Sequence, residues 1–270
     1  MTVTRNQIIV VSIIALLAAF LFAKGYKTSI GEVSTATIKS SVFDIEAYIA
    51  EEKKELSPVT VEKVKLLEAD TKTQNGLQKI IVLWDSLNNQ LISAHYMEQY
   101  ATIEPSEKNW FAAGSKFYTF ASLSNDSQLI AISASKAKKA FEKVLELNPN
   151  NLDAQTATAA IIVQIDQDVM RGVALLKDVV SKDSNNVQAI FTLGMLSIQS
   201  GQFDKAEERF QKLIKLQPFN PEYYFYLGEV YAKSGNTIKA IKTYETCKTL
   251  LKDDEAKKEI ETLIIKLKNI

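Results

Sequence analysis

A pattern that repeats every 34 residues constrains this chain more than any other feature of its sequence. The pair Leu193–Gly194 recurs as Leu227–Gly228, each time inside an apolar run with helical spacing. A Ser-Gly turn follows each run at the same distance, and a second helical segment follows each turn. A repeat of this length buries a continuous core only when it stacks on its neighbours. The sequence therefore predicts an all-α chain of stacked, antiparallel helix pairs.

The pattern resembles the tetratricopeptide repeat, a helix–turn–helix unit of the same length. The best-matching units are 187–220 and 221–254, which carry the family's Leu-Gly pair, a small residue and an aromatic residue in the second helix. The resemblance implies a solenoid in which the helix pairs form a superhelix. Less regular units precede these two, and they are 73–106, 107–151 and a degenerate unit at 152–186. In the first of these we expect Trp84 and Tyr96 in the core, and in the second an extended second helix from Ser127.

The glycines inside the helices need a packing explanation, because glycine in a helix costs about 1 kcal/mol relative to alanine. A missing side chain lets a neighbouring helix approach closely, and the packing offsets the cost. In the last repeat we expect a helix backbone to pack over Gly228. The residues expected in the core are Tyr224, Leu227, Gly228 and Tyr231. This pattern leaves Phe225 and Tyr226 without a core role.

The segment 1–27 contains an apolar run, Ile8 to Ala23, in which Ser12 is the one polar residue, with Arg5 before it and Lys24 after it. Its sixteen residues rise about 24 Å as a helix, against roughly 30 Å of hydrocarbon, and flanking residues extend the span. We expect an uncleaved signal anchor, a single transmembrane helix. The following domain is then expected outside the cytoplasm, in a bacterial periplasm. A cleaved signal peptide and a buried core helix are the alternatives.

Both ends of the repeat region (73–254) are expected to carry caps. Segment 28–72 begins as a polar linker and continues as two helices, the second with Ser57 as N-cap and Pro58 at its first position. We expect this helix pair to cap the repeats, and a partner-facing or dimerising element is the alternative. At the other end, 255–270 predicts a capping helix with one apolar stripe.

Composition limits the chemistry that this chain can perform. Its 32 basic and 32 acidic residues give no basic footprint for nucleic acid. A single histidine, His95, and a single cysteine, Cys247, cannot form a Cys/His metal site or an intramolecular disulfide. The sequence contains no phosphate-binding loop and no nucleophile motif. We therefore expect no catalytic residue, no cofactor, no metal site and no enzyme activity.

The prediction of function depends on which residues line the concave surface of the repeats. In tetratricopeptide repeat proteins, the first helices of successive repeats line a concave groove that receives peptides. The residues that the resemblance places there are Thr156, Ala160, Val163, Phe191, Met195, Ile198, Phe225, Glu229 and Ala232. Most of them are apolar, so they favour a protein or peptide partner with an apolar segment. Alternatively, the chain's own terminal helices fill the groove.

The first hypothesis is accordingly a membrane-anchored, non-catalytic adaptor that holds a partner protein. Such an adaptor would serve envelope protein assembly or chaperoning, and a cytochrome c maturation factor lies within this class. The alternative is a structural solenoid that associates with itself into a homo-oligomer.

Overall fold

The computed structural model describes residues 43–269, which form thirteen α-helices, one short 3-10 turn and no strand. The predicted all-α class is thus confirmed for this part of the chain. The described residues divide into two compact units, and the division falls between Ile161 and Ile162. The predicted anchor lies outside the described residues. Within residues 43–269, no helix has the length and apolar character needed to cross a membrane.

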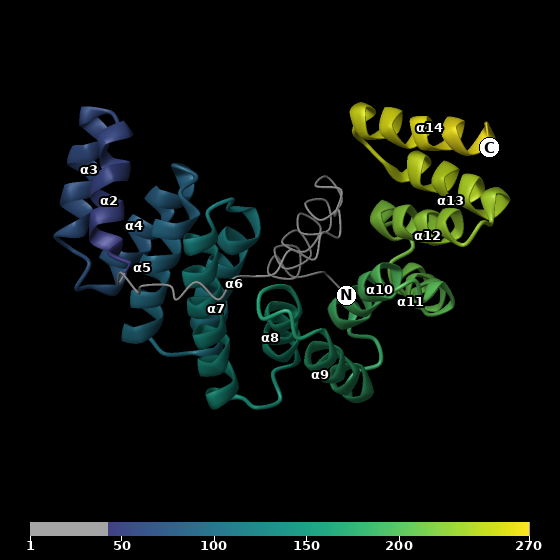
Figure 1. Ribbon diagram of the computed structural model, residues 1–270. Coiled ribbons are helices and arrows are strands. Elements are labelled where there is room, and N and C mark those ends of the chain that lie inside the picture. The colour runs from purple at the N-terminus through teal and green to yellow at the C-terminus, as the bar shows by residue number, and fades with distance from the viewer. Residues whose placement is uncertain (1–42, 270) are drawn as a thin grey trace. The chain divides into compact units, whose positions relative to one another are not determined.

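In the first unit, short helical segments precede longer helices. The elements are α2 (Ile45–Glu52), the 3-10 turn η1 (Lys53–Glu55), α3 (Pro58–Glu68), α4 (Gln74–Ser86), α5 (Gln90–Ile103), α6 (Glu107–Leu123) and α7 (Ser127–Leu147), followed by α8 (Leu152–Gln164), in which the division falls. Helices α4, α5, α6 and α7 lie side by side (Figure 1). This arrangement follows from short turns between amphipathic helices.

Most helices begin at a polar residue whose side chain accepts a hydrogen bond from the first turn. Ser57 accepts from the backbone N–H of Thr60 at 3.2 Å, and Pro58 takes the first position of α3, as the sequence predicted. Asp126 caps α7 in the same way, so that helix begins at Ser127, the predicted start.

The core of the first unit includes both aromatic residues predicted for 73–106. Trp84 is 1% exposed and Tyr96 is 5% exposed. Ile49 of α2 and Val64 of α3 belong to the same hydrophobic cluster as these two rings. The two short helices therefore bury their apolar side chains on the α4–α5 pair.

The second unit continues the same succession of helices. Its elements are α9 (Val169–Lys182), α10 (Val187–Gln199), α11 (Phe203–Leu216), α12 (Pro221–Lys233), α13 (Thr237–Leu250) and α14 (Asp254–Lys268). Each packs against the next along the chain (Figure 1). The turns after α10 and α12 place Gly201 and Gly235 at φ angles of 71° and 80°, a region that favours glycine.

Three glycines in first helices lie under an aromatic ring of the helix that follows. The pairs are Gly114 with Phe141, Gly194 with Phe210, and Gly228 with Tyr244. A Cβ atom on Gly228 would lie 2.7 Å from the ring of Tyr244. The expectation that a helix backbone covers this glycine is therefore wrong in detail, because the space is taken by a side-chain ring.

Helix α14 closes the end of the second unit. Ile260 and Ile264 are buried, and α14 packs against α13. On the same side, Lys248 of α13 forms an ion pair with Glu261 at 2.5 Å. The remaining face of α14 is mostly charged and exposed, as expected for the last helix of a stack.

Candidate partner-binding face

The predicted groove residues on α8 fall on both sides of the division between the units. Thr156 and Ala160 belong to the first unit and are buried, and Val163 belongs to the second unit and is partly exposed. Thr156 donates its hydroxyl hydrogen to the carbonyl of Leu152 at 2.7 Å. A continuous groove from α8 to α12 remains a prediction.

On α10, two of the three residues predicted to line the groove are buried. Phe191 is 4% exposed and Ile198 is also buried, whereas Met195 is partly exposed. The ring of Phe191 packs against Tyr223 and Tyr226 of α12, with centroid distances of 6.1 and 5.5 Å. Phe191 is thus covered by the first helix of the next repeat.

Tyr226 has a core role that the sequence pattern did not assign. It is 4% exposed, and its ring stacks on Phe210 with centroids 5.5 Å apart. Tyr223 is buried as well, and its hydroxyl donates to Gln217 at 2.9 Å. Tyr224, predicted in the core, is partly exposed, and its hydroxyl donates to the carbonyl of Pro218 at 2.9 Å.

Phe225 stands 34 residues after Phe191, yet it is partly exposed. Its ring contacts Tyr226 and Tyr244, with centroid distances of 5.2 and 6.0 Å. Ala232, two turns further along α12, is also partly exposed. We call the surface formed by Glu222, Phe225, Glu229 and Ala232 the α12 face. These positions lie on one side of a helix, because their spacings are three, four and three residues.

Glu229 is the most unusual member of the α12 face. It is 5% exposed, and the Nζ of Lys233 lies 2.9 Å from its Oε1 in an ion pair. The other carboxylate oxygen, Oε2, has no hydrogen-bond partner among the residues that the structure describes. Burial raises the pKa of Glu229, and Lys233 opposes this shift. A carboxylate placed this deep is costly unless it is paired.

Glu222 provides a second carboxylate on the same face. It lies in the first turn of α12 and is partly exposed. Burial raises its pKa from 4.5 to about 7. Glu222 was missed at the level of the sequence, although it follows Gln188 at the repeat spacing and so occupies a matched position.

A shallow recess of about 320 Å³ lies elsewhere on the second unit, between α11, α12 and α13. Its lining residues are Gln211, Ile214, Lys215, Tyr224, Leu227, Lys242, Thr243 and Thr246. On α12 it uses Tyr224 and Leu227, which belong to the repeat pattern rather than to the α12 face. The two surfaces are therefore distinct.

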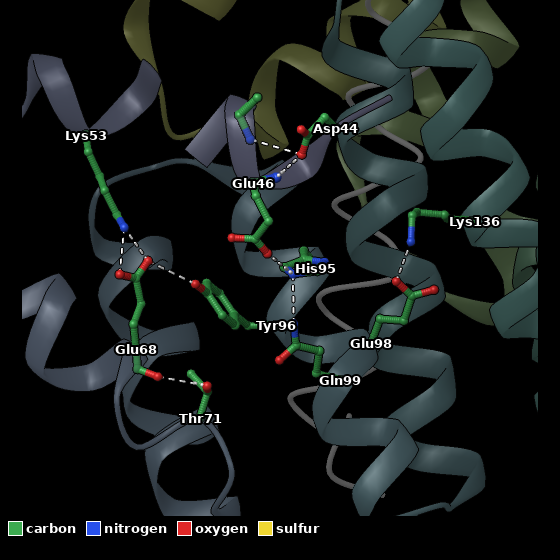
Figure 2. Close-up of polar contacts among 11 residues, drawn as sticks. Asp44, Glu46, Lys53, Glu68, Thr71, His95, Tyr96, Glu98, Gln99 and Lys136 are labelled. Atoms are coloured by element: carbon green, nitrogen blue, oxygen red, sulfur yellow. Dashed lines mark hydrogen bonds and ion pairs between the residues drawn. The ribbon is translucent and has the colours of Figure 1, made fainter. Parts of the chain in front are cut away.

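His95 belongs to a polar cluster of the first unit (Figure 2). Its Nε2 lies 2.8 Å from the amide nitrogen of Gln99 and 3.9 Å from a carboxylate oxygen of Glu46. Burial, followed by the charge of Lys136, lowers the pKa of His95. His95 of α5 thus contacts Gln99 on its own helix and lies near Glu46 of α2, which fits a structural role.

The same cluster ties the short N-terminal helices to the longer ones (Figure 2). Lys53 pairs with Glu68 at 2.5 Å, and Glu68 accepts a hydrogen bond from the Tyr96 hydroxyl at 3.2 Å. Lys136 of α7 pairs with Glu98 of α5 at 2.5 Å.

Across residues 43–269, no group of three or more His, Cys, Asp or Glu side chains is placed to hold a metal ion.

Cys247 is buried on α13. Burial raises the pKa of its thiol to about 11, so the thiol stays protonated at neutral pH. Because the thiolate is the reactive form, this cysteine is a packing residue in the folded chain.

Two known protein-family models match helix pairs described above. Residues 128–224 match the cytochrome c-type biogenesis protein H TPR domain, and residues 210–242 match the tetratricopeptide repeat. Residues 128–242 of the chain thus match tetratricopeptide repeat models. A thermophilic tetratricopeptide repeat protein of Thermus thermophilus shares the fold, with a TM-score of 0.53 and 15% identity. The match covers 73% of this chain and 100% of the Thermus thermophilus protein.

Two curated proteins are similar over shorter stretches. Superkiller protein 3 of Schizosaccharomyces pombe is 26% identical over 126 residues, which are 44% of this chain and 9% of that protein. The human mitochondrial import receptor subunit TOM70 is 30% identical over 81 residues, which are 30% of this chain and 13% of that protein. The matched part of this chain therefore spans only a small part of either relative.

Proposed function

We propose that this chain is a non-catalytic adaptor that docks an apolar segment of a partner protein on the α12 face. The observation that carries the proposal is the difference between two matched phenylalanines. Phe191 is buried under two tyrosines, whereas Phe225 is partly exposed. Partly exposed Ala232 on the same face and Met195 on α10 add apolar surface. Accessible apolar side chains beside a rigid helix stack suit a docked helix or extended peptide.

Substitution of Phe225 by glutamate tests the docking face. The full chain is extracted in mild detergent, used as bait, and the captured proteins are quantified by mass spectrometry. Phe219→Glu is the matched control, because Phe219 is 83% exposed and precedes α12. We expect Phe225→Glu to lose a captured protein that Phe219→Glu retains, with both variants showing wild-type circular dichroism. An unchanged set of captured proteins in Phe225→Glu contradicts this function.

The adaptor is proposed to be tethered to a membrane by residues 1–27, with its helices on the extracytoplasmic side. The apolar run in this segment, with its flanking basic residues, supports the proposal. Removal of residues 1–27 should release the protein from the membrane fraction. Protease added to intact spheroplasts should digest the repeats. Recovery of the full chain in the soluble fraction contradicts tethering, and protection from protease contradicts the orientation.

The pathway is proposed to be cytochrome c maturation, a specific case of envelope protein assembly. The match of residues 128–224 to a cytochrome c-type biogenesis domain favours this pathway. The test is binding of the full chain to an immobilised apocytochrome c, with an unrelated unfolded protein as control. We expect binding to the apocytochrome that Phe225→Glu weakens. Equal binding to both proteins contradicts the pathway and leaves the docking face to be tested by its own experiment.

A further inference from the structure

We propose that two copies of this chain associate through one exposed side of α3, packed antiparallel about a two-fold axis. The residues of this side are Val59, Glu62, Lys63 and Leu66, which we call the α3 face. Such a dimer does not depend on the proposed docking function, because α3 belongs to the first unit and the α12 face to the second.

The α3 face carries an apolar residue at each end and is exposed along its length. Its residues follow one another at spacings of three, one and three, so they share one side of the helix. Val59 is 82% exposed and Leu66 is 67% exposed. Apolar residues that stand alone are ordinary on a protein surface, whereas two on one helix face favour a surface that another molecule covers.

The opposite side of α3 is fixed in the first unit. Val64 is buried in the hydrophobic cluster, and α3 packs against α4 (Figure 1). Glu68 on this inner side pairs with Lys53 within the chain. A second copy can therefore cover the α3 face without displacing the side chains of the core.

The centre of the α3 face holds two charges of opposite sign. Glu62 and Lys63 are both exposed, and neither has an ion-pair partner among the residues that the structure describes. Adjacent residues on a helix do not face each other, so these two do not neutralise one another within one copy. One acidic and one basic residue give the face no net charge, which favours neither an acidic nor a basic partner protein.

An antiparallel pair of α3 helices matches this pattern with itself. A two-fold axis that passes between Glu62 and Lys63 places Val59 of each copy opposite Leu66 of the other. The same axis places Glu62 of each copy opposite Lys63 of the other. Each apolar residue is then covered by an apolar residue, and each charge by the opposite charge. This self-complementarity identifies a second copy of the chain as the occupant.

The size of the α3 face predicts a weak dimer. Helix α3 has 11 residues and is about 16 Å long, so one such pair buries far less than the roughly 1,600 Å² of a standard interface. Tethering by residues 1–27, proposed above, would raise the effective concentration of the two copies. A dimer carries two α12 faces, so it would bind a partner with two docking segments more tightly than one copy does.

Energy transfer between two labelled copies tests the dimer. Full chains in mild detergent carry a donor or an acceptor fluorophore at the C-terminus, and energy transfer is measured as their concentration rises. Wild-type copies should show saturable transfer. Val59→Lys should weaken association by about tenfold or more, because it removes two apolar contacts and adds charge. The matched control is Ile238→Lys, which changes a comparably exposed residue of α13 and should behave like the wild type.

Charge reversal at the centre of the α3 face gives the sharpest result. Glu62→Lys leaves two positive charges on each copy and Lys63→Glu leaves two negative charges, so each variant should associate with itself about tenfold more weakly. A mixture of donor-labelled Glu62→Lys with acceptor-labelled Lys63→Glu restores both opposite-charge pairs and should return to the wild-type level. The double variant Glu62→Lys with Lys63→Glu should also associate with itself as the wild type does. Pairing of position 62 with position 63 across two copies predicts both rescues.

Three results would overturn the dimer, given variants with wild-type circular dichroism. The first is a wild type whose energy transfer does not rise with concentration. The second is transfer that Val59→Lys and the single charge reversals leave unchanged, which would place the contact elsewhere, such as in residues 1–27. The third is a mixture that associates no better than either single reversal alone. Phe225→Glu should leave the transfer unchanged, so failure of the docking function is distinguishable from failure of the dimer.

Discussion

The α10–α11 and α12–α13 pairs obey one packing rule but present different inner surfaces. In both pairs an aromatic ring of the second helix covers a glycine of the first. In the first pair, tyrosines of the next helix cover Phe191. Helix α14 follows the second pair with Lys257 and Ile260 at the matched positions, and Phe225 is partly exposed. In these two repeats, the matched phenylalanine is buried where another repeat with tyrosines follows, and it is partly exposed where α14 follows.

The largest expected difference between the two pairs concerns their matched phenylalanines. Phe191→Ala should lower the free energy of unfolding by about 3–5 kcal/mol, because it empties a buried aromatic site. Phe225→Ala should cost about 1–2 kcal/mol, because part of that ring is already accessible. Denaturant unfolding followed by circular dichroism measures both. Equal losses of unfolding free energy in the two variants would show that Phe191 and Phe225 are equally buried, which would contradict the difference described here.

The next difference concerns the two glycines. A Cβ atom would lie 2.7 Å from the Tyr244 ring at Gly228, and 3.1 Å from the Phe210 ring at Gly194. Gly228→Ala should therefore cost about 1–3 kcal/mol through overpacking. At Gly194, the gain of about 1 kcal/mol in helix propensity should largely offset a smaller clash. The midpoints of thermal unfolding should separate accordingly. A stabilising Gly228→Ala would contradict the close packing described for this pair.

The sequence predicted the repeated architecture because that architecture depends on local spacing. The Leu-Gly pairs, the Ser-Gly turns and the start of α7 after Asp126 could all be read from residue types and their distances. The exposure of the candidate groove could not be read in this way. Whether Phe191 or Tyr226 is buried depends on side chains one repeat away, and the same pattern stands in both repeats.

The sequence predicted only part of the acidic character of the α12 face. Glu229 was included among the groove residues from its position, but its burial depends on the surrounding aromatic side chains. Glu222 looked like an ordinary acidic residue in a first helical turn, where the helix dipole favours it. Its raised pKa is caused by burial in the folded chain. That burial cannot be predicted from the spacing of residues along one helix.

A smaller, pH-dependent difference should separate Glu222→Gln from the wild type. Burial raises the pKa of Glu222 from 4.5 to about 7, so the folded chain holds this proton to higher pH than the unfolded chain does. The wild type should therefore lose stability as the pH rises between these values, and the loss should be complete above about pH 7. The advantage of Glu222→Gln should grow to about 1–2 kcal/mol between about pH 5 and pH 8.

Unfolding curves at several pH values measure this advantage. Glu245→Gln, at an exposed position of α13, is the control. An advantage of Glu222→Gln that is the same at every pH would show that Glu222 is not held in a buried environment.

The most direct test of the central claim is photo-crosslinking in intact cells from the two phenylalanines that bracket the start of α12. A photoreactive phenylalanine analogue replaces either Phe225, on the α12 face, or Phe219, which is 83% exposed. The account predicts a crosslink to one partner protein from position 225 that position 219 does not form. Peptide mapping by mass spectrometry should place that crosslink in an apolar segment of the partner. Crosslinks from position 225 that fall only within this chain would contradict the account.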